Sequence, residues 1–274
     1  MREKTELKNN TLFNAIIRID LFKIENLPNV LKRLVKYAEE NNFKFRTNDI
    51  KSVNINIDDP ETLLTQEMIK ANIDETKNYE IISQDEKEKF VINEYFLIFE
   101  KSDFEGYAKI DKYITHLKEI FIIIVSVEKN INISRVGIRK ANHLFINDIS
   151  FISKYINYQL PCEDYKLIDE YSIMQKNLST ISSNIIFTLK KGTYIKDKDE
   201  VGEMYRAVWD IDCYKRNVAI KTVLDTINSL NEEVFFRYRK IITDDLYHIL
   251  CENDLTEEYL KAQKIYGGIC KNDE

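Results

Sequence analysis

One stretch, from Met204 to Cys251, constrains the fold of this chain more than any other. It opens with MYRAVWDIDCY, which has the composition of a strand, and continues into a long run with helical periodicity. The apolar residues of that run recur near a 3.6-residue period, at Ile220, Leu224, Ile227, Val234, Tyr238, Ile241 and Ile242. A helix of roughly 25 residues is about 37 Å long, the span of a small domain. We therefore expect a long C-terminal helix near Asn217 to Ile242, packed against a sheet.

The rest of the chain mixes strand patterns with helical patterns. Strands are expected at Leu12–Phe22, Lys51–Ile57, Phe90–Glu100, Ile131–Phe145, Ile185–Lys190 and Tyr205–Tyr214, the last two as an antiparallel pair. Helices are expected at Asn26–Asn42, Tyr107–Phe121 and Asp148–Tyr158, with a short one from Pro60 through Ile69. This order predicts an α+β fold, with a largely antiparallel or mixed sheet and helices packed on one face.

Two polar segments separate these elements. Ser83–Lys89 (SQDEKEK) is typical of a hairpin tip or exposed loop, and Lys190–Gly202 (KKGTYIKDKDEVG) is typical of a mobile connection. We expect residues 1–262 to form a single α+β domain, with two intimate halves meeting near 146–184 as the alternative, and residues 263–274 to form a flexible tail.

Composition limits the partners. The 274 residues carry a net charge of -6, with a sequence pI of about 5.4, so no overall basic excess favours nucleic acid. The longest apolar run, Ile120–Val125, is too short to span a bilayer, and the polar start MREKTELKNN lacks the features of a signal peptide. The four cysteines form no CxxC pair. We expect a cytoplasmic protein with reduced thiols and no membrane partner.

Asp210 and Asp212 form the first candidate site. They lie two residues apart on an expected strand, so both carboxylates project from one face, while Trp209, Ile211 and Cys213 project from the other. Such a pair could hold a divalent metal, as in nucleases, although a metal needs further ligands. The alternative, which we favour, is a solvated strand face above a core in which Trp209 is buried.

Arg139, Asn142 and His143 form the second candidate. Arg139 with His143 is similar to the Arg-x4-6-His signature of HEPN-type ribonucleases, but only three residues intervene and a strand is expected here. In a catalytic role His143 would act as general acid or base and Arg139 would hold a phosphate. The favoured alternative is that Arg139 and Asn142 satisfy buried carbonyls or pair with a carboxylate.

Arg237, Arg239 and Lys240 form a third candidate, a basic cluster late on the long helix that could contact a nucleic-acid backbone or a partner. Acidic neighbours are close, and an i,i+4 pair between Glu233 and Arg237 explains the cluster more simply.

Two of these segments resemble parts of a sporadically distributed family of uncharacterised bacterial proteins. Gly137, Ile138, Arg139 and Asn142 match its Gly-Leu-Arg-Tyr-Ile-Asn-Arg-like strand, and Asp210, Ile211 and Asp212 match its Leu-Asp-Ile-Asp-like strand. The sequence departs from the family's pattern at Thr11, Asn14, Lys140, Ala141 and His143. The resemblance implies no known activity. The family's patchy distribution implies an accessory role in a mobile-element or phage-defence system.

Together these observations favour a non-catalytic accessory or interaction protein that acts through a protein partner, encoded nearby, and that self-associates as a homodimer. Sixteen Tyr and fourteen Phe could supply interface anchors. No cofactor is expected, because no Gly-rich phosphate loop, nucleophile elbow or zinc motif is present. The alternative is a metal-dependent nuclease, or another enzyme acting on nucleic acid, that uses Asp210 and Asp212.

Overall fold

The fold is built on one antiparallel sheet. The computed structural model describes residues 11–56, 70–102, 110, 113–146, 152–158, 170–196 and 200–251. Nine strands pair in the order β2-β3-β4-β5-β1-β6-β9-β8-β7, and every neighbouring pair is antiparallel. The strands are β1 (Leu12–Leu21), β2 (Lys44–Asn56), β3 (Lys70–Ile82), β4 (Glu88–Ile92), β5 (Phe96–Ser102), β6 (Ile133–Ile146), β7 (Glu170–Asn177), β8 (Ser182–Lys196) and β9 (Glu200–Val218). The helices are α1 (Leu27–Glu40), α2 (Thr115–Val127), α3 (Ile152–Tyr155), α4 (Val223–Ile241) and α5 (Asp244–Cys251). The predicted α+β class is confirmed.

Two halves of the chain repeat one plan. In the first half, β1 and α1 precede the meander β2 to β5, and α2 follows; in the second half, β6 and α3 precede the meander β7 to β9, and α4 follows. In each half the last strand of the meander pairs with the first strand of that half, β5 with β1 and β9 with β6. The halves join where β1 pairs with β6, so the sheet is continuous across the two halves.

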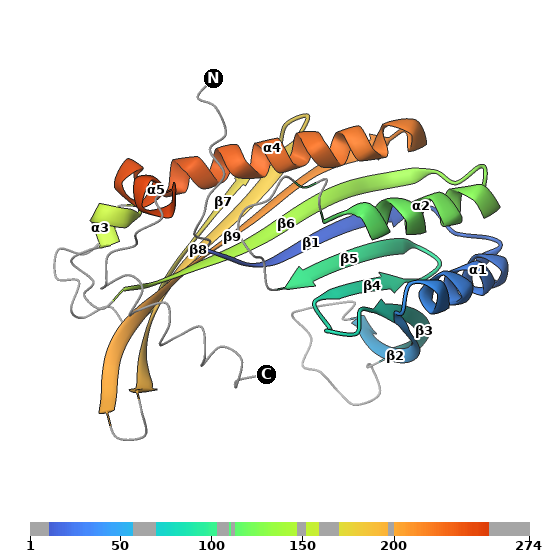
Figure 1. The fold of residues 1–274 in the computed structure, drawn as a ribbon, viewed down its shortest axis with the longest axis horizontal. Coiled ribbons are helices and arrows are strands. Elements are labelled where there is room, and N and C mark those ends of the chain that lie inside the picture. Colours follow the sequence, from blue (N-terminus) through green and yellow to red (C-terminus); the bar gives the residue numbers. More distant parts are fainter. Residues whose placement is uncertain are drawn as a thin grey trace.

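Helices cover one face of the sheet, which we call the covered face (Figure 1). The helix α4 lies across β6 and β9. Because side chains alternate along a strand, every second residue points into this layer. The side chains of Trp209, Ile211 and Cys213 are fully buried there, as the sequence predicts, beneath Val234 and Tyr238 of α4. Burial raises the pKa of the Cys213 thiol to about 12.

The long C-terminal helix is shorter than predicted. The structure keeps β9 extended through Val218 and adds a 3₁₀ turn at Ile220–Thr222 before α4 begins at Val223. The helix ends because Ile242 is extended, at φ -91° and ψ 149°, and forms a β-bridge with Ile156. The hydroxyl of Thr243 then accepts a hydrogen bond from the Leu246 amide (3.2 Å) and starts α5.

One predicted strand and one predicted mobile connection need correction. Phe90–Glu100 is divided between β4 and β5, because the Asn93 side-chain oxygen accepts hydrogen bonds from the Tyr95 and Phe96 amides (2.8 and 3.0 Å) and closes a tight turn. Lys190–Gly202 contributes to strands rather than a mobile connection, since β8 continues to Lys196 and β9 begins at Glu200. Polar residues can form strands when a neighbouring strand supplies the backbone hydrogen bonds.

The remaining predictions differ mainly in their boundaries. Residues 51–56 of the strand expected at Lys51–Ile57 lie within β2, which begins earlier, at Lys44. The strands β3 and β7 were not predicted. Residues 122–127 extend α2 beyond Phe121, and Asp148–Tyr158 contains only the single turn α3 among its described residues. The short helix expected at Pro60–Ile69 and the tail at 263–274 lie outside the described residues.

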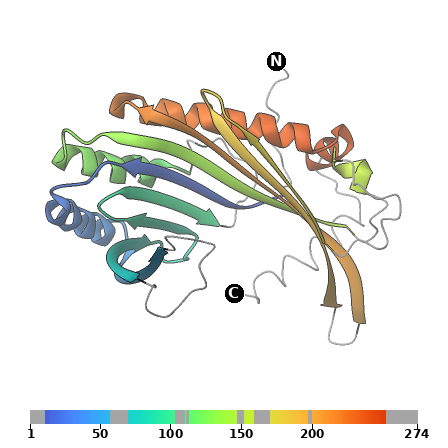
Figure 2. The ribbon, with the colours of Figure 1, turned by 180° about the vertical axis from the view of Figure 1, so that it is seen from behind.

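The other face of the sheet, which we call the open face, lies on the side away from α4 (Figure 2). Among the described residues, no helix crosses this side of β1, β6 and β9. The ends of β8 and β9 bend away from α4, and β2 and β3 lie on the same side at the opposite end of the molecule.

Candidate functional site

Alternating arginine and aspartate side chains line the centre of the open face. The guanidinium of Arg139 on β6 holds Asp210 on β9, with Nε donating to both carboxylate oxygens at 2.9 and 2.8 Å. Further along the same two strands, Arg135 Nη2 on β6 donates to Asp212 Oδ2 on β9 at 3.1 Å. Both pairs are diagonal, because the register places Arg139 opposite Asp212 and Ala141 opposite Asp210.

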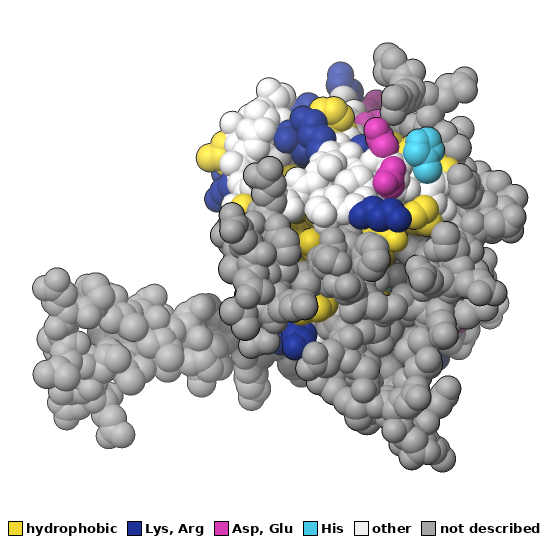
Figure 3. Space-filling view, turned by 90° about the vertical axis from the view of Figure 1, so that its left-hand side faces the viewer, with side chains coloured by type: hydrophobic (Ala, Val, Ile, Leu, Met, Phe, Trp, Pro, Cys, Tyr) yellow, Lys and Arg dark blue, Asp and Glu magenta, His cyan; other side chains and the backbone are white. Residues whose placement is uncertain are grey.

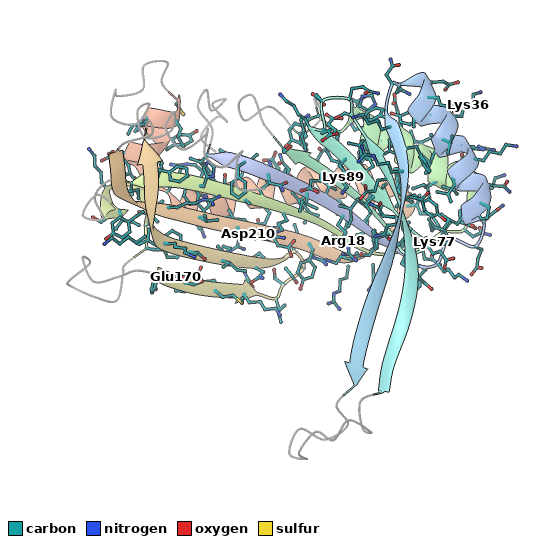
Figure 4. The ribbon with its side chains drawn as sticks, turned by 90° about the horizontal axis from the view of Figure 1, so that it is seen from below. Arg18, Lys36, Lys77, Lys89, Glu170 and Asp210 are labelled. Atoms are coloured by element: carbon teal, nitrogen blue, oxygen red, sulfur yellow. The ribbon has the colours of Figure 1, made fainter. Side chains whose placement is uncertain are left out.

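The row of charges continues onto β1. Arg135 Nη1 lies 3.8 Å from Asp20 Oδ2, and the Asp20 carboxylate also pairs with Arg18. The Arg135 guanidinium lies 4.4 Å from the centre of the Tyr214 ring. A Cβ atom at Gly137 would already lie 3.4 Å from both Arg135 Nη2 and Tyr214 Cβ, so the glycine leaves room for this stacking. Arg18 and Asp210 lie on the same side of the sheet, which Figure 4 shows from below.

Burial and these contacts shift the pKa values of Asp212 and Arg139. Burial raises the pKa of the Asp212 carboxyl, and the nearby Arg135 guanidinium opposes that rise. The hydrogen bond to Asp210 raises the pKa of Arg139. Asp210 and Asp212 share one face, as predicted, and each already has an arginine partner. No group of three His, Cys, Asp or Glu side chains among the described residues is arranged to hold a metal ion.

An aromatic–arginine cluster, formed by Phe13, His143, Phe145 and Arg206, lies further along the same face. The Phe13 and His143 rings stack with centroids 4.8 Å apart and planes 13° apart, and Phe145 is 5.2 Å from His143. The Arg206 guanidinium lies 5.5 Å from the Phe13 ring and 5.9 Å from the Phe145 ring. Burial, and to a smaller extent Arg206, lowers the pKa of His143 to about 4, so the imidazole is neutral at pH 7.

Arg139, Asn142 and His143 do not lie together on one face, and the contacts of Arg139 with the Asp210 carboxylate and of Asn142 with a backbone carbonyl agree with the favoured alternative. Asn142 faces the opposite side of β6, where its Oδ1 accepts a hydrogen bond from Thr11 (3.2 Å) and its amide donates to the Lys140 carbonyl (3.4 Å). Arg139 and His143 do share the open face, but four residues of a strand separate their Cα atoms by about 13 Å. The strand alternation that places Arg139 on the surface therefore directs Asn142 into the core.

Several buried polar atoms on the open face lack a hydrogen-bond partner within the described part of the chain. They are Asn14 Oδ1, Arg135 Nε, His143 Nδ1, Asn184 Oδ1 and Arg206 Nε. Buried polar atoms without a partner are uncommon in native proteins. Sequence reasoning missed Phe13, Arg135 and Arg206. Alternation along each strand assigns each residue to one side of its own strand, but the pairing of β1, β6 and β9 that brings them to one face is not in the sequence.

The basic cluster on α4 is neutralised locally. Arg237 Nε donates to Glu233 at 2.7 Å, which confirms the predicted i,i+4 pair. Arg239 donates to Asp244 at 2.7 Å and lies 3.7 Å from the Tyr247 ring centre, and Lys240 lies 4.3 Å from the Phe236 ring centre. The end of the molecule near α5 shows both basic and acidic side chains among its coloured residues (Figure 3).

Two comparisons with known proteins found no relative of this chain. No protein-family model matches the chain, and none of the curated proteins is significantly similar to it. The resemblance to the sporadic bacterial family therefore stays a prediction. Among the described residues, no helix is long and apolar enough to cross a membrane.

Proposed function

We propose that this chain is a non-catalytic accessory protein that binds a protein partner on its open face. The aromatic–arginine cluster would anchor the partner, and the arginine–aspartate row beside it would select the partner by charge. A cytoplasmic location belongs to the same proposal and is supported by composition alone. A role in a mobile-element or phage-defence system is supported only by the resemblance described above.

The observation that carries the proposal is the composition of the aromatic–arginine cluster. Interface residues that dominate binding energy are most often aromatic side chains and arginine, and they lie in partly desolvated pockets. Phe13, His143 and Arg206 have this character, and their ring faces and the free polar atoms of His143 and Arg206 belong to one side of the sheet.

The adjacent charges favour protein over nucleic acid. A phosphate backbone is bound by basic groups in excess, and binding releases counterions. On the open face Arg139 and Arg135 are each matched by an aspartate, and Arg18 by Asp20. Paired charges of both signs suit a protein surface with complementary charges, which guides association and orientation more than it adds affinity.

A metal-dependent nuclease is the alternative, and the shared face of Asp210 and Asp212 supports it. A metal ion would have to replace Arg139 and Arg135 as the partners of these carboxylates. The double variant Asp210→Asn/Asp212→Asn separates the two functions, because asparagine retains hydrogen bonding but binds divalent cations poorly.

The test begins with affinity purification from the native host, followed by reconstitution with the purified co-eluting protein. Wild type, Phe13→Ala/Arg206→Ala and Asp210→Asn/Asp212→Asn are compared for partner affinity and for cleavage of nucleic acids in Mg²⁺ and Mn²⁺. Lys36→Ala on α1 serves as the control, since it also breaks an ion pair but lies outside the candidate sites.

We expect the cluster variant to weaken binding roughly tenfold or more, the aspartate variant to change it by less than about threefold, and the control to leave it unchanged. Metal-dependent cleavage that disappears in the folded aspartate variant would establish the nuclease instead. Equal affinity of the cluster variant and wild type would remove the open face from the partner interface.

A further inference from the structure

The strand β7 forms one border of the sheet. All eight residues pair with β8, from Glu170 opposite Lys190 to Asn177 opposite Ser183, without a register shift. No described strand pairs with its other side, which leaves outward backbone groups for another strand. Figure 4 shows Glu170 at this border. Most β7 side chains are exposed, and Met174 is 65% exposed.

Natural proteins usually protect such a border. Proline, a β-bulge, several lysines or a covering element are the common devices. The sequence of β7, EYSIMQKN, has no proline and a single lysine, and its pairing with β8 shows no bulge. The strand is therefore suited to β-augmentation, in which a further strand joins the sheet.

The charges of β7 identify the added strand. Glu170 and Lys176 lie three residues before and three residues after Ile173. Lys176 has no ion-pair partner among the described residues, and Glu170 has only a 4.0 Å contact with Lys190. An antiparallel copy of the same strand, centred on Ile173, would place each Glu170 opposite a Lys176 of the other copy.

We propose that two copies of this chain pair through β7, antiparallel, with Ile173 opposite its counterpart. This pairing puts Tyr171 opposite Gln175, Ser172 opposite Met174, and Glu170 opposite Lys176, each of them twice. The inference goes beyond the proposed function and does not depend on it, because β7 lies outside the aromatic–arginine cluster.

Symmetry excludes neighbouring registers. Side chains of residues that lie opposite each other in a sheet point to the same face. A two-fold axis perpendicular to the sheet keeps each side chain on the face to which it points. Only residues an even number of positions apart can therefore face each other. The next registers that symmetry allows are centred on Ser172 or on Met174, and they place Glu170 opposite Met174 or Leu178, respectively. The register centred on Ile173 is the one that joins opposite charges at both ends.

The dimer would bring two copies into one continuous sheet with both open faces on the same side. Each open face would then remain accessible to a partner. The apolar row of Ile173 and Tyr171, which contacts the core of one copy, would continue into the second copy.

Sedimentation equilibrium of the full chain tests the pairing through charge reversal. Lys176→Glu and Glu170→Lys should each raise the dimer dissociation constant about tenfold or more, because like charges then face each other. The double variant Glu170→Lys/Lys176→Glu should restore dimerisation to near wild type. Lys36→Glu, on the exposed side of α1, is the control for net charge and should have little effect.

A cysteine at position 173 tests the register independently. Opposite residues of an antiparallel pair have Cα atoms about 4.5–5.5 Å apart, which a disulfide can bridge. Ile173→Cys should cross-link two copies on oxidation well above the wild-type background, and Met174→Cys should not. A monomer at all concentrations, a dimer indifferent to both single charge reversals, or cross-linking equal at the two positions would overturn the proposal.

Discussion

The two faces of β6 and β9 use alternate residues of the same strands for opposite purposes. On the covered face, Trp209, Ile211 and Ile138 are fully buried and pack beneath α4. On the open face, Arg139 and Asp210 form an ion pair, and the Arg139 side chain is 54% exposed. The difference separates two kinds of contribution, since apolar burial stabilises the fold while partly exposed ion pairs contribute little to it. The arginine–aspartate pairs of the open face contribute little to the stability of the fold, so this surface is a candidate for binding a partner.

Trp209 provides the largest expected effect. Its side chain is fully buried between β9 and α4, with the ring centroid 6.1 Å from that of Tyr238. Trp209→Ala should lower the free energy of unfolding by roughly 3–5 kcal/mol, whereas Val208→Ala on the open face should lower it by about 1 kcal/mol or less. Denaturant titration of both variants measures the contrast. An unchanged Trp209→Ala midpoint would mean that the covered face is not the core.

Lys140 places a charge on the covered face. Its side chain is 1% exposed, and Nζ donates to Asn231 Oδ1 at 2.7 Å. Asn231→Leu removes an acceptor from a buried ammonium and should cost about 2–3 kcal/mol. The double variant Lys140→Met/Asn231→Leu should be more stable than Asn231→Leu alone, since it replaces the polar pair by apolar groups. A double variant as unstable as the sum of both singles would show that the lysine is needed for the fold.

His143 predicts a pH dependence of stability. Its pKa is about 4 in the folded protein, compared with about 6.5 in an unfolded chain, so as pH falls the unfolded state binds the proton first. Stability should therefore decrease between about pH 6.5 and pH 4, by roughly 2.5 kcal/mol from this group. The difference in unfolding free energy between wild type and His143→Phe should shift by that amount across the window. A difference that is flat across these pH values would contradict the buried, neutral imidazole.

The Arg139–Asp210 pair should have the smallest effect on stability. Because Arg139 is more than half exposed, Asp210→Asn should change the free energy of unfolding by less than about 1 kcal/mol. Thermal melts at low and high salt measure this change. A loss of several kcal/mol would mean that the open face supports the fold, and the contrast between the two faces would fail.

Periodicity predicted most of the covered face. Alternation in AVWDIDCY placed Trp209 in the core, and the apolar stripe of α4 located the helix that covers it. The strands β3 and β7 were missed because their polar sequences gain strand structure from pairing with neighbours, which a local pattern does not contain. The break after Ile241 was missed for a related reason, since a bridge to Ile156 from a distant segment fixes it.

The candidate site was predicted only in part. The alternation of side chains along a strand correctly placed Asp210 and Asp212 on one face. The same rule should have placed Asn142 and His143 on opposite faces. The partners of the two aspartates, Arg139 and Arg135, depend on the register between β6 and β9, which the sequence does not specify. The aromatic–arginine cluster likewise joins β1, β6 and β9.

Hydroxyl-radical footprinting of the full chain, with and without its purified partner, locates the bound surface most directly. The open-face account predicts that Phe13 becomes protected, while Phe236 on α4, which is 50% exposed, reacts at the same rate in both samples. Protection of Met174 would report β7 pairing and should already be present without the partner. Protection of Phe236 with unchanged reactivity at Phe13 would contradict the account.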